Sequence, residues 1–353
     1  MKNRLKGRGS QTKTKNPFLK YHYEVEDDIY CDVPIELNQR TTFMIDTPHK
    51  IMNKVESEDI PLSYSLNVYQ GCEHGCVYCY ARNTHEYWEL SAGLDFEQKI
   101  FVRHNAPDLL RKTFEQKNWK PTPFMLSGNT DCYQPAERTF KLTRQILEIC
   151  LAYKHPVSII TKNSLILRDI DILQDLAALR LVHVNISLTT LDDTLRQHLE
   201  PRTSTAEKRL KVIYQLSRQK IPVQVMVAPI IPGLNSYEIP AIIQKAADAG
   251  ALGAEYTIVR LNGSIATIFT DWIRKTYPDL ADKVLRQIAE CHNGTLSDYR
   301  PGLRLKGSGK IAEMIQYIVR VAIDKYMKDR KMPEYDLTLF SVPSKTNVQL
   351  KLF

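Results

Sequence analysis

The sequence predicts an α/β fold: a partial (β/α)₆ TIM-like barrel with parallel strands, a helical C-terminal extension and an irregular N-terminal lead-in. Six short apolar segments alternate with helix-like segments between residues 65 and 260. Strands connected in this way lie parallel with right-handed crossovers, so their C-terminal ends share one rim. A hydrophobic fraction of 43% is enough for a large core. No apolar run approaches the roughly 20 residues that a membrane helix needs, so no membrane association is expected.

The six expected strands are short, apolar and bounded by Pro, Gly, Asn or Lys. They cover residues 65–69, 123–127, 157–161, 182–188, 223–228 and 255–259. Apolar residues at helical spacing predict the intervening helices over 140–153, 167–179, 204–216 and 236–249. Ser204 and Glu207 have the spacing of a capping box at the start of the third helix. Gly250 is expected to end the fourth helix.

The chain divides into four predicted parts. These are a basic disordered tail (1–20), an irregular segment (21–60), the barrel core (61–262) and a mainly helical extension packed on the core (263–353). Helical spacing in the extension covers residues 266–276, 280–291 and 311–328, and the closing segment 335–353 reads as extended.

The positive charge is concentrated in the tail. The net charge is +8, but residues 1–20 contain seven Lys and Arg and no acid, so the rest of the chain carries only +1. Such a tail either attracts a polyphosphate such as nucleic acid or is a solvated extension. The basic N-terminus does not resemble a secretory signal, and seven cysteines, an odd number, argue against a disulfide framework. A reducing, cytoplasmic location is therefore predicted.

Three cysteines lie within eight residues and suggest a metal centre. Cys72, Cys76 and Cys79 have the spacing Cys-x₃-Cys-x₂-Cys. Thiolates bind both zinc and iron–sulfur clusters, but structural zinc takes four protein ligands, whereas this loop offers three. A 4Fe–4S cluster held by three thiolates keeps one iron open for a substrate. The alternative is a zinc knuckle completed by His74, His85 or Cys132.

The segment Gly71–Tyr87, with an aromatic residue before the last cysteine of its Cys-x₃-Cys-x₂-Cys loop, resembles the radical S-adenosylmethionine (SAM) superfamily. It is most similar to a bacterial branch related to spore photoproduct lyase and DNA repair photolyase-like proteins. Segments 129–137, 161–163, 186–191, 200–202 and 228–235 carry the same resemblance. The resemblance implies a 4Fe–4S cluster on Cys72, Cys76 and Cys79, reductive cleavage of SAM to a 5′-deoxyadenosyl radical, and an electron donor such as flavodoxin or ferredoxin.

The resemblance also implies where SAM binds. The superfamily holds the methionine amino group after the second strand, and this chain has Ser127, Gly128, Asn129, Thr130 and Asp131 there instead of the usual Gly-Gly-Glu. An ordinary strand-to-loop turn is the alternative.

Further cofactor contacts are implied at other strand ends. Ser187 and Thr189 share one face of the fourth strand and could bind a ribose hydroxyl, although they could equally be a plain strand end. Arg202 could pair with the methionine carboxylate or form a salt bridge with Glu200 or Glu207. Lys162, at the end of the third predicted strand, could likewise contact SAM or form a salt bridge within the protein.

Three residues have implied roles in radical transfer. Cys132 lies near the place where spore photoproduct lyase carries a hydrogen-donating cysteine, and its alternative is an inert, half-buried residue. Tyr78 and Tyr80 resemble tyrosines that relay the radical in that enzyme, and Tyr78 also adjoins the SAM site. Their alternative role is packing against the cluster.

Three functions follow from these observations. The first is a radical SAM lyase-like enzyme acting on nucleic acid, such as a DNA lesion. The second keeps the chemistry but takes a tRNA, peptide or metabolite. The third is a non-enzymatic zinc or iron–sulfur interaction protein.

Overall fold

The computed structural model describes residues 7–14, 16–18, 40–59 and 62–343, and contains a seven-stranded sheet in the order β10-β9-β8-β7-β6-β3-β2. Its strands are β2 (Met52–Lys54), β3 (Tyr64–Leu66), β6 (Phe124–Leu126), β7 (Val157–Thr161), β8 (Val182–Ser187), β9 (Val223–Ile230) and β10 (Ala254–Ile258). All neighbours are parallel except β2, which is antiparallel to β3. The predicted partial parallel barrel is confirmed.

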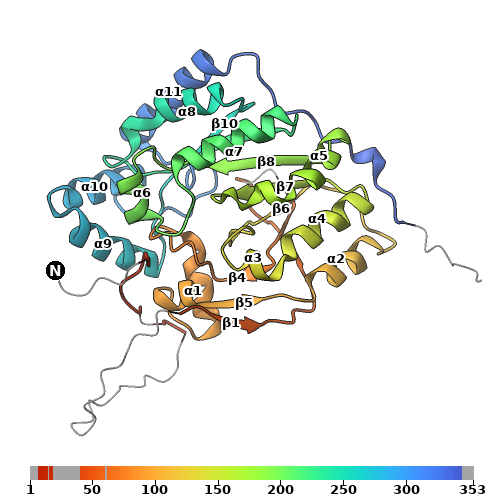
Figure 1. The fold of residues 1–353 in the computed structure, drawn as a ribbon. Helices are drawn as coiled ribbons and strands as arrows, with labels where there is room; N and C mark the ends of the chain where they lie inside the picture. The colour runs from red at the N-terminus through yellow and green to blue at the C-terminus, as the bar shows by residue number, and fades with distance from the viewer. Residues whose placement is uncertain (1–6, 15, 19–39, 60–61, 344–353) are drawn as a thin grey trace, which may run out of the picture.

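Helices connect the strands and cover the sheet (Figure 1). They are α3 (Glu137–Phe140), α4 (Leu142–Ala152), α5 (Ile170–Ala178), α6 (Asp193–Leu199), α7 (Ala206–Arg218) and α8 (Ile239–Asp248), with the short 3₁₀ helices η2 (Ser164–Asp169) and η3 (Ser236–Glu238). Helix α5 packs on β8, α7 on β8 and β9, and α8 on β9. Their buried faces carry Leu173, Ile213 and Ile243, all 0% exposed. The apolar spacing that predicted these helices is therefore the face that meets the sheet.

A second, smaller sheet was not predicted. It has the order β1-β5-β4, formed by β1 (Thr42–Ile45), β5 (Lys99–Val102) and β4 (Tyr69–Gln70). The lead-in 21–60 therefore contains two strands, β1 and β2, within its described part, and the expected strand 65–69 divides between the two sheets. Helices α1 (Leu94–Gln98) and α2 (Ala106–Phe114) and the 3₁₀ helix η1 (Tyr80–Trp88) complete this region.

The prediction of a disordered tail over residues 1–20 is wrong for its described part. Arg8, Ser10 and Asn16 are 3%, 1% and 6% exposed. Asn16 donates hydrogen bonds to the carbonyls of Glu86 and Leu90. Polar groups buried in this way need partners, and the partners come from residues about 70 positions along the chain. We call residues 7–14 the N-terminal strap.

The C-terminal part is helical, as predicted. It contains α9 (Ser264–Thr276), α10 (Pro278–Cys291), α11 (Gly309–Tyr326) and the 3₁₀ helix η4 (Leu337–Leu339). Helix α11 packs on α8, α10 and β10. Residues 344–353 of the predicted extended segment lie outside the described residues. None of the described helices is both long and apolar enough to span a membrane.

Candidate iron–sulfur site

The three cysteines lie in one loop, residues 71–79, between β4 and η1. Cys72 and Cys76 are 7% and 8% exposed, Cys79 is half-buried, and all three are free thiols. Burial raises the pKa of each thiol, and negative charge on Cys76 and Cys79 would raise the pKa of Cys72 further. The thiols are thus close enough to interact electrostatically. We call this segment the cysteine loop.

Basic side chains lie where thiolates would need them. Burial raises the pKa of both Cys76 and Cys79, and the charge of Glu200 raises that of Cys76 further. Lys162 and Arg209 act to lower the pKa of Cys76, and Arg82 and Lys162 act to lower that of Cys79. Thiolates are the form that binds metal, and nearby cations favour that form. The donor set therefore fits a cluster ligated by three thiolates.

A ready-made single-metal site is not present in the described part of the chain. No group of three or more His, Cys, Asp or Glu side chains converges there on one metal position. This finding disfavours the zinc knuckle completed by His74, His85 or Cys132, because a zinc ion needs four donors around one point. A 4Fe–4S cluster takes its thiolates on separate irons, so its ligands do not have to converge in this way.

The N-terminal strap packs directly against the cysteine loop. The carboxylate of Glu97, 0% exposed, accepts hydrogen bonds from the amides of Gly9 and Ser10 at 3.0 and 2.8 Å and forms a salt bridge with Arg82 at 2.5 Å. Arg82 in turn donates to the carbonyl of Cys76 at 2.8 Å. A Cβ atom at Gly9 would lie 1.6 Å from the Gly75 carbonyl oxygen. Only glycine therefore permits this approach of the two backbones.

The loop after β6 is held by groups that sequence reasoning missed. The side-chain oxygen of Asn67 accepts from the amides of Asn129 and Thr130. Ser127 has a φ of +87° and donates to the Thr130 carbonyl, and Thr130 donates to the Tyr69 carbonyl. These hydroxyl protons are engaged within the protein. Asn129, by contrast, has an exposed side chain on this rim.

Tyr80 connects the two loops. Its hydroxyl donates to the carbonyl oxygen of Gly128, and its ring lies beneath the guanidinium of Arg260. Burial, followed by the charge of Cys79, raises the pKa of Tyr80 to about 12. Gly128 and Tyr80, both predicted site residues, are thus in direct contact.

Asp131 connects the cysteine loop to the C-terminal end of β7. It accepts from the hydroxyl of Thr161 at 2.7 Å and the amide of Lys162 at 2.8 Å, and lies 3.4 Å from His74. Burial opposes ionisation of this carboxyl, but His74 and the hydrogen bonds outweigh it and lower its pKa to about 2. An acceptor satisfied so fully is a poor candidate for the methionine ammonium.

Glu200 is a second carboxylate, besides Asp131, that accepts several hydrogen bonds near the cysteine loop. Its carboxylate is 0% exposed and accepts from the hydroxyls of Tyr78 and Thr189 and from Arg209 at 2.5 Å. Burial opposes its ionisation, but the charges of Arg209 and Lys162 and the hydroxyl donors lower its pKa to about 2. The predicted residues Tyr78 and Thr189 therefore meet at this carboxylate.

Arg202 pairs with neither predicted acid. Its guanidinium lies 3.1 Å from Glu73 of the cysteine loop, and its amide donates to the His74 carbonyl. The alternative of a salt bridge with Glu200 or Glu207 is wrong, because Arg202 pairs with Glu73 instead and Glu200 pairs with Arg209. Arg202 thus fastens the loop after α6 to the cysteine loop.

The remaining predicted residues are buried. Ser187 is 1% exposed, and its carbonyl accepts from Arg209. Cys132 is 1% exposed, and its thiol lies in the main hydrophobic core. Burial, followed by the charges of Asp131 and Glu137, raises the pKa of the Cys132 thiol well above its usual range. This environment favours the packing role of Cys132 over hydrogen donation.

The hubs Glu97, Glu200, Arg209 and Asn67 were not singled out as site residues. Their key partners are distant in the sequence: Glu97 and Gly9 are 88 positions apart, and Glu200 and Tyr78 are 122 apart. Local sequence does not identify a partner at such separations.

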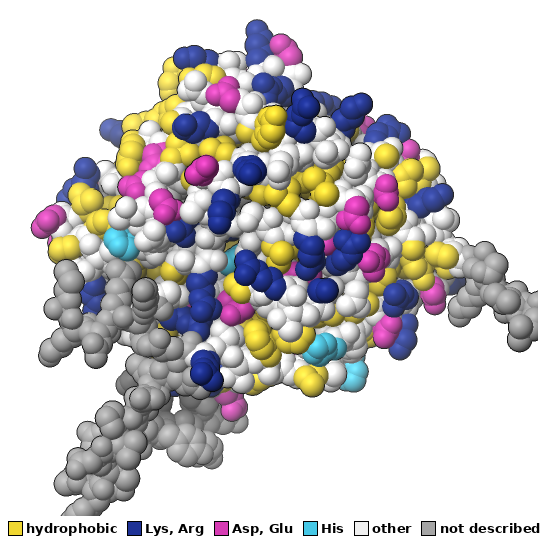
Figure 2. Space-filling view, viewed as in Figure 1, with side chains coloured by type: hydrophobic (Ala, Val, Ile, Leu, Met, Phe, Trp, Pro, Cys, Tyr) yellow, Lys and Arg dark blue, Asp and Glu magenta, His cyan; other side chains and the backbone are white. Residues whose placement is uncertain are grey.

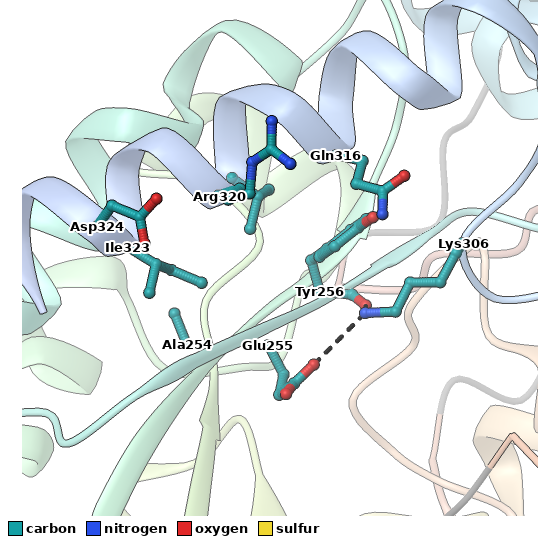
Figure 3. Close-up of a pocket in the computed structure, with 9 residues that line it drawn as sticks. Ala254, Glu255, Tyr256, Lys306, Gln316, Arg320, Ile323 and Asp324 are labelled. Atoms are coloured by element: carbon teal, nitrogen blue, oxygen red, sulfur yellow. Dashed lines mark hydrogen bonds and ion pairs between the residues drawn. The ribbon is translucent and has the colours of Figure 1, made fainter. Parts of the chain in front are cut away.

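A cavity of about 290 Å³ lies away from these residues, between β10 and α11. Figure 3 shows Glu255 and Lys306 at one side of it and Arg320 and Asp324 from α11 at the other. It contains none of the predicted site residues.

On the face shown in Figure 2, basic, acidic and hydrophobic side chains are interspersed, in keeping with the near-neutral charge beyond residue 20.

Comparison with known proteins identifies this arrangement. Residues 66–246 match the family described as the radical SAM superfamily. An uncharacterised protein of Mycobacterium tuberculosis is 33% identical over 235 residues, covering 66% of this chain and 69% of its own. One of Methanocaldococcus jannaschii is 31% identical, covering 50% and 63%. Spore photoproduct lyase complexed with dinucleoside spore photoproduct has a TM-score of 0.59 at 16% identity, covering 80% of this chain and 79% of that chain, which shows the shared fold.

Proposed function

Because the chain belongs to the radical SAM superfamily, we propose that Cys72, Cys76 and Cys79 hold its 4Fe–4S cluster and that its substrate is a nucleic-acid lesion. As a superfamily member it is an enzyme that uses a 4Fe–4S cluster and SAM, so the non-enzymatic alternative is wrong. When bound, these cofactors supply a 5′-deoxyadenosyl radical that abstracts hydrogen from the substrate. The observation that carries the ligand assignment is three free thiols in one buried loop with cations beside them.

Side chains of this protein stabilise the thiolates, bind SAM and exclude water from the site. Lys162, Arg82 and Arg209 stabilise the thiolates electrostatically. Val77 and Tyr78, 0% and 7% exposed, provide buried apolar surface next to the cysteines in the same loop. We assign the methionine ammonium to the exposed side-chain oxygen of Asn129, because the Ser127 hydroxyl oxygen and the Asp131 carboxylate already accept hydrogen bonds within the protein. Ser187 and Thr189 remain our candidates for the ribose.

The substrate assignment draws on two observations. The first is the fold similarity to spore photoproduct lyase, a protein solved with a dinucleoside photoproduct. The second is that positions 1–20 contain six basic residues besides the buried Arg8, and no acid. Radical SAM enzymes need a reductant, and we propose a flavodoxin or ferredoxin for this role.

The ligand assignment is tested by single substitution. Cys76→Ala should abolish the visible thiolate-to-iron absorption of the anaerobically reconstituted protein and the conversion of SAM to 5′-deoxyadenosine. Cys150→Ala is the matched control, because Cys150 is 0% exposed in α4, away from the loop, and should keep both. A full 4Fe–4S signal in Cys76→Ala would contradict the assignment.

The substrate is tested with SAM deuterated at C5′. Ultraviolet-irradiated thymine oligonucleotides should exchange label with 5′-deoxyadenosine in the presence of the enzyme and reductant. Unirradiated DNA is the control. Label transfer to tRNA or peptide, with none to irradiated DNA, would replace the lesion with that second class of substrate.

A further inference from the structure

Arg260 occupies the rim of the barrel beside the cysteine loop. It follows β10 by two residues, where the parallel strands end. Its guanidinium carbon lies 5.6 Å from the centre of the Tyr80 ring. Tyr80 directly follows Cys79, and its hydroxyl donates to the carbonyl oxygen of Gly128 in the loop after β6. Arg260 therefore lies over the ring of the residue that connects the two loops of the candidate site.

Three basic residues that follow β10 in the chain are each paired with a carboxylate. Arg300 pairs with Asp298 at 2.6 Å, Arg304 pairs with Asp59, and Lys306 reaches Glu255 at 3.4 Å (Figure 3). Arg260 has no carboxylate within salt-bridge distance, and it donates no hydrogen bond to any residue in the described ranges 7–14, 16–18, 40–59 and 62–343. It is thus a cation with a fixed position and an available donor face.

The surroundings of Arg260 favour an anionic ligand. Burial lowers its pKa, and so does the charge of Arg304, which means that the positive charge is partly desolvated and close to a like charge. Asp59 attracts it at longer range but is bonded to Arg304 and to the amide of Gly302. A guanidinium is planar, and its N–H groups form a fork that matches two oxygens of one group.

We propose that Arg260 binds a phosphodiester group of the substrate strand and so sets which nucleotide reaches the barrel mouth. This inference rests on the proposed nucleic-acid substrate. A phosphodiester is favoured over a carboxylate because aromatic side chains accompany the arginine on this rim. Tyr80 and Tyr299 are 44% and 69% exposed, and both lie close enough to Arg260 to influence its pKa. Exposed aromatic rings beside a cation are the arrangement on which single-stranded bases stack.

The test measures binding of a short single-stranded thymidine oligonucleotide to reconstituted holoenzyme with SAM, at several salt concentrations. Arg260→Gln should weaken binding roughly tenfold and reduce the slope of log affinity against log salt by about 1. Arg260→Lys should keep the slope and regain only part of the affinity, because it retains the charge without the fork. Arg300→Gln is the matched control, since Arg300 is already paired with Asp298, and should change neither quantity.

A neutral methylphosphonate is then placed at each internucleoside position in turn. At one position it should weaken wild-type binding roughly tenfold and leave Arg260→Gln binding unchanged, as expected when the two changes remove the same contact. Equal affinity and salt slope for wild type and Arg260→Gln would overturn the inference while leaving the nucleic-acid substrate standing. A wild-type enzyme that cleaves SAM but does not bind the oligonucleotide would overturn both, and the cluster assignment would survive.

Discussion

Glu200 is the residue on which the buried polar contacts between the cysteine loop and α7 converge. Glu200→Gln would leave Arg209, whose side chain is 2% exposed, facing a neutral partner. Removing one member of a buried ion pair destabilises a protein by about 3–5 kcal/mol, because the remaining charge is desolvated without compensation. We expect a loss of this size in urea unfolding of the apoprotein. The control is Asp108→Asn, which breaks an exposed pair with Arg111 and should cost less than about 1 kcal/mol. Equal losses would contradict the role assigned to Glu200.

Cys132 allows a second test at the residue scale. Its thiol packs in the core at 1% exposure, so Cys132→Ala should remove a packing contact and destabilise the fold by about 1 kcal/mol. The yield of 5′-deoxyadenosine per cluster, measured anaerobically, should stay at the wild-type value, as should the pattern of products from any substrate found. New radical by-products in this variant would restore Cys132 as the hydrogen donor.

At the scale of elements, local sequence predicted the parallel strands well. The predicted strand 157–161 coincides with β7, because Val157 and Ile159, both 0% exposed, are part of an apolar run that only a buried strand accommodates. The capping residues of the helices were predicted less accurately than the strands. The helix that was expected to begin at Ser204 is capped by Thr205, whose hydroxyl accepts from the Lys208 amide, while Ser204 bonds to Ser164. Both residues suit a cap, and tertiary contact decides between them.

The N-terminal strap could not be predicted, because its stability comes from distant partners. Residues 7–14 have the composition of a solvated tail. Their amides are nevertheless bound by Glu97, and Arg8 donates to the Glu97 carbonyl at 2.7 Å. The candidate site was limited in the same way: the three cysteines were evident from their spacing, whereas the side chains that hold their loop were not.

Gly9→Ala tests whether the strap supports the cysteine loop. The added Cβ would overlap the Gly75 carbonyl oxygen, so the strap should detach and expose the loop to solvent. We expect lower iron and sulfide content after reconstitution, faster loss of the cluster absorption in air, and proteolytic cleavage within the strap. Gly253→Ala is the matched control, because its Cβ would meet only Gln224 at 3.4 Å. Unchanged iron content in Gly9→Ala would show that the strap is dispensable for the loop.

The whole molecule is an open barrel whose two sheet edges are connected by loops. The sheet ends at β2 on one side and at β10 on the other. After β2, Asp59 accepts from the Gly302 amide and pairs with Arg304. The segment containing Arg304 lies along β10, since the amide of Ile258 donates to the carbonyl of Leu305. The contacts of Asp59 thus connect the β2 edge to the β10 edge, which share no backbone hydrogen bonds in the described sheet. They also position Arg304 near Arg260.

Asp59→Asn should therefore loosen both edges together. Asp59 is 6% exposed, and losing its charge-assisted bonds should lower the melting temperature by about 2–4 °C. Amide hydrogen exchange should accelerate at β2 and at residues 302–306 in the same variant, although these segments are far apart in the sequence. Asp298→Asn is the matched control: Asp298 is equally buried at 5% but pairs with Arg300 within its own loop, so only that loop should exchange faster. Acceleration confined to residues 302–306 in Asp59→Asn would mean that the edges open independently and that other contacts keep the barrel mouth together.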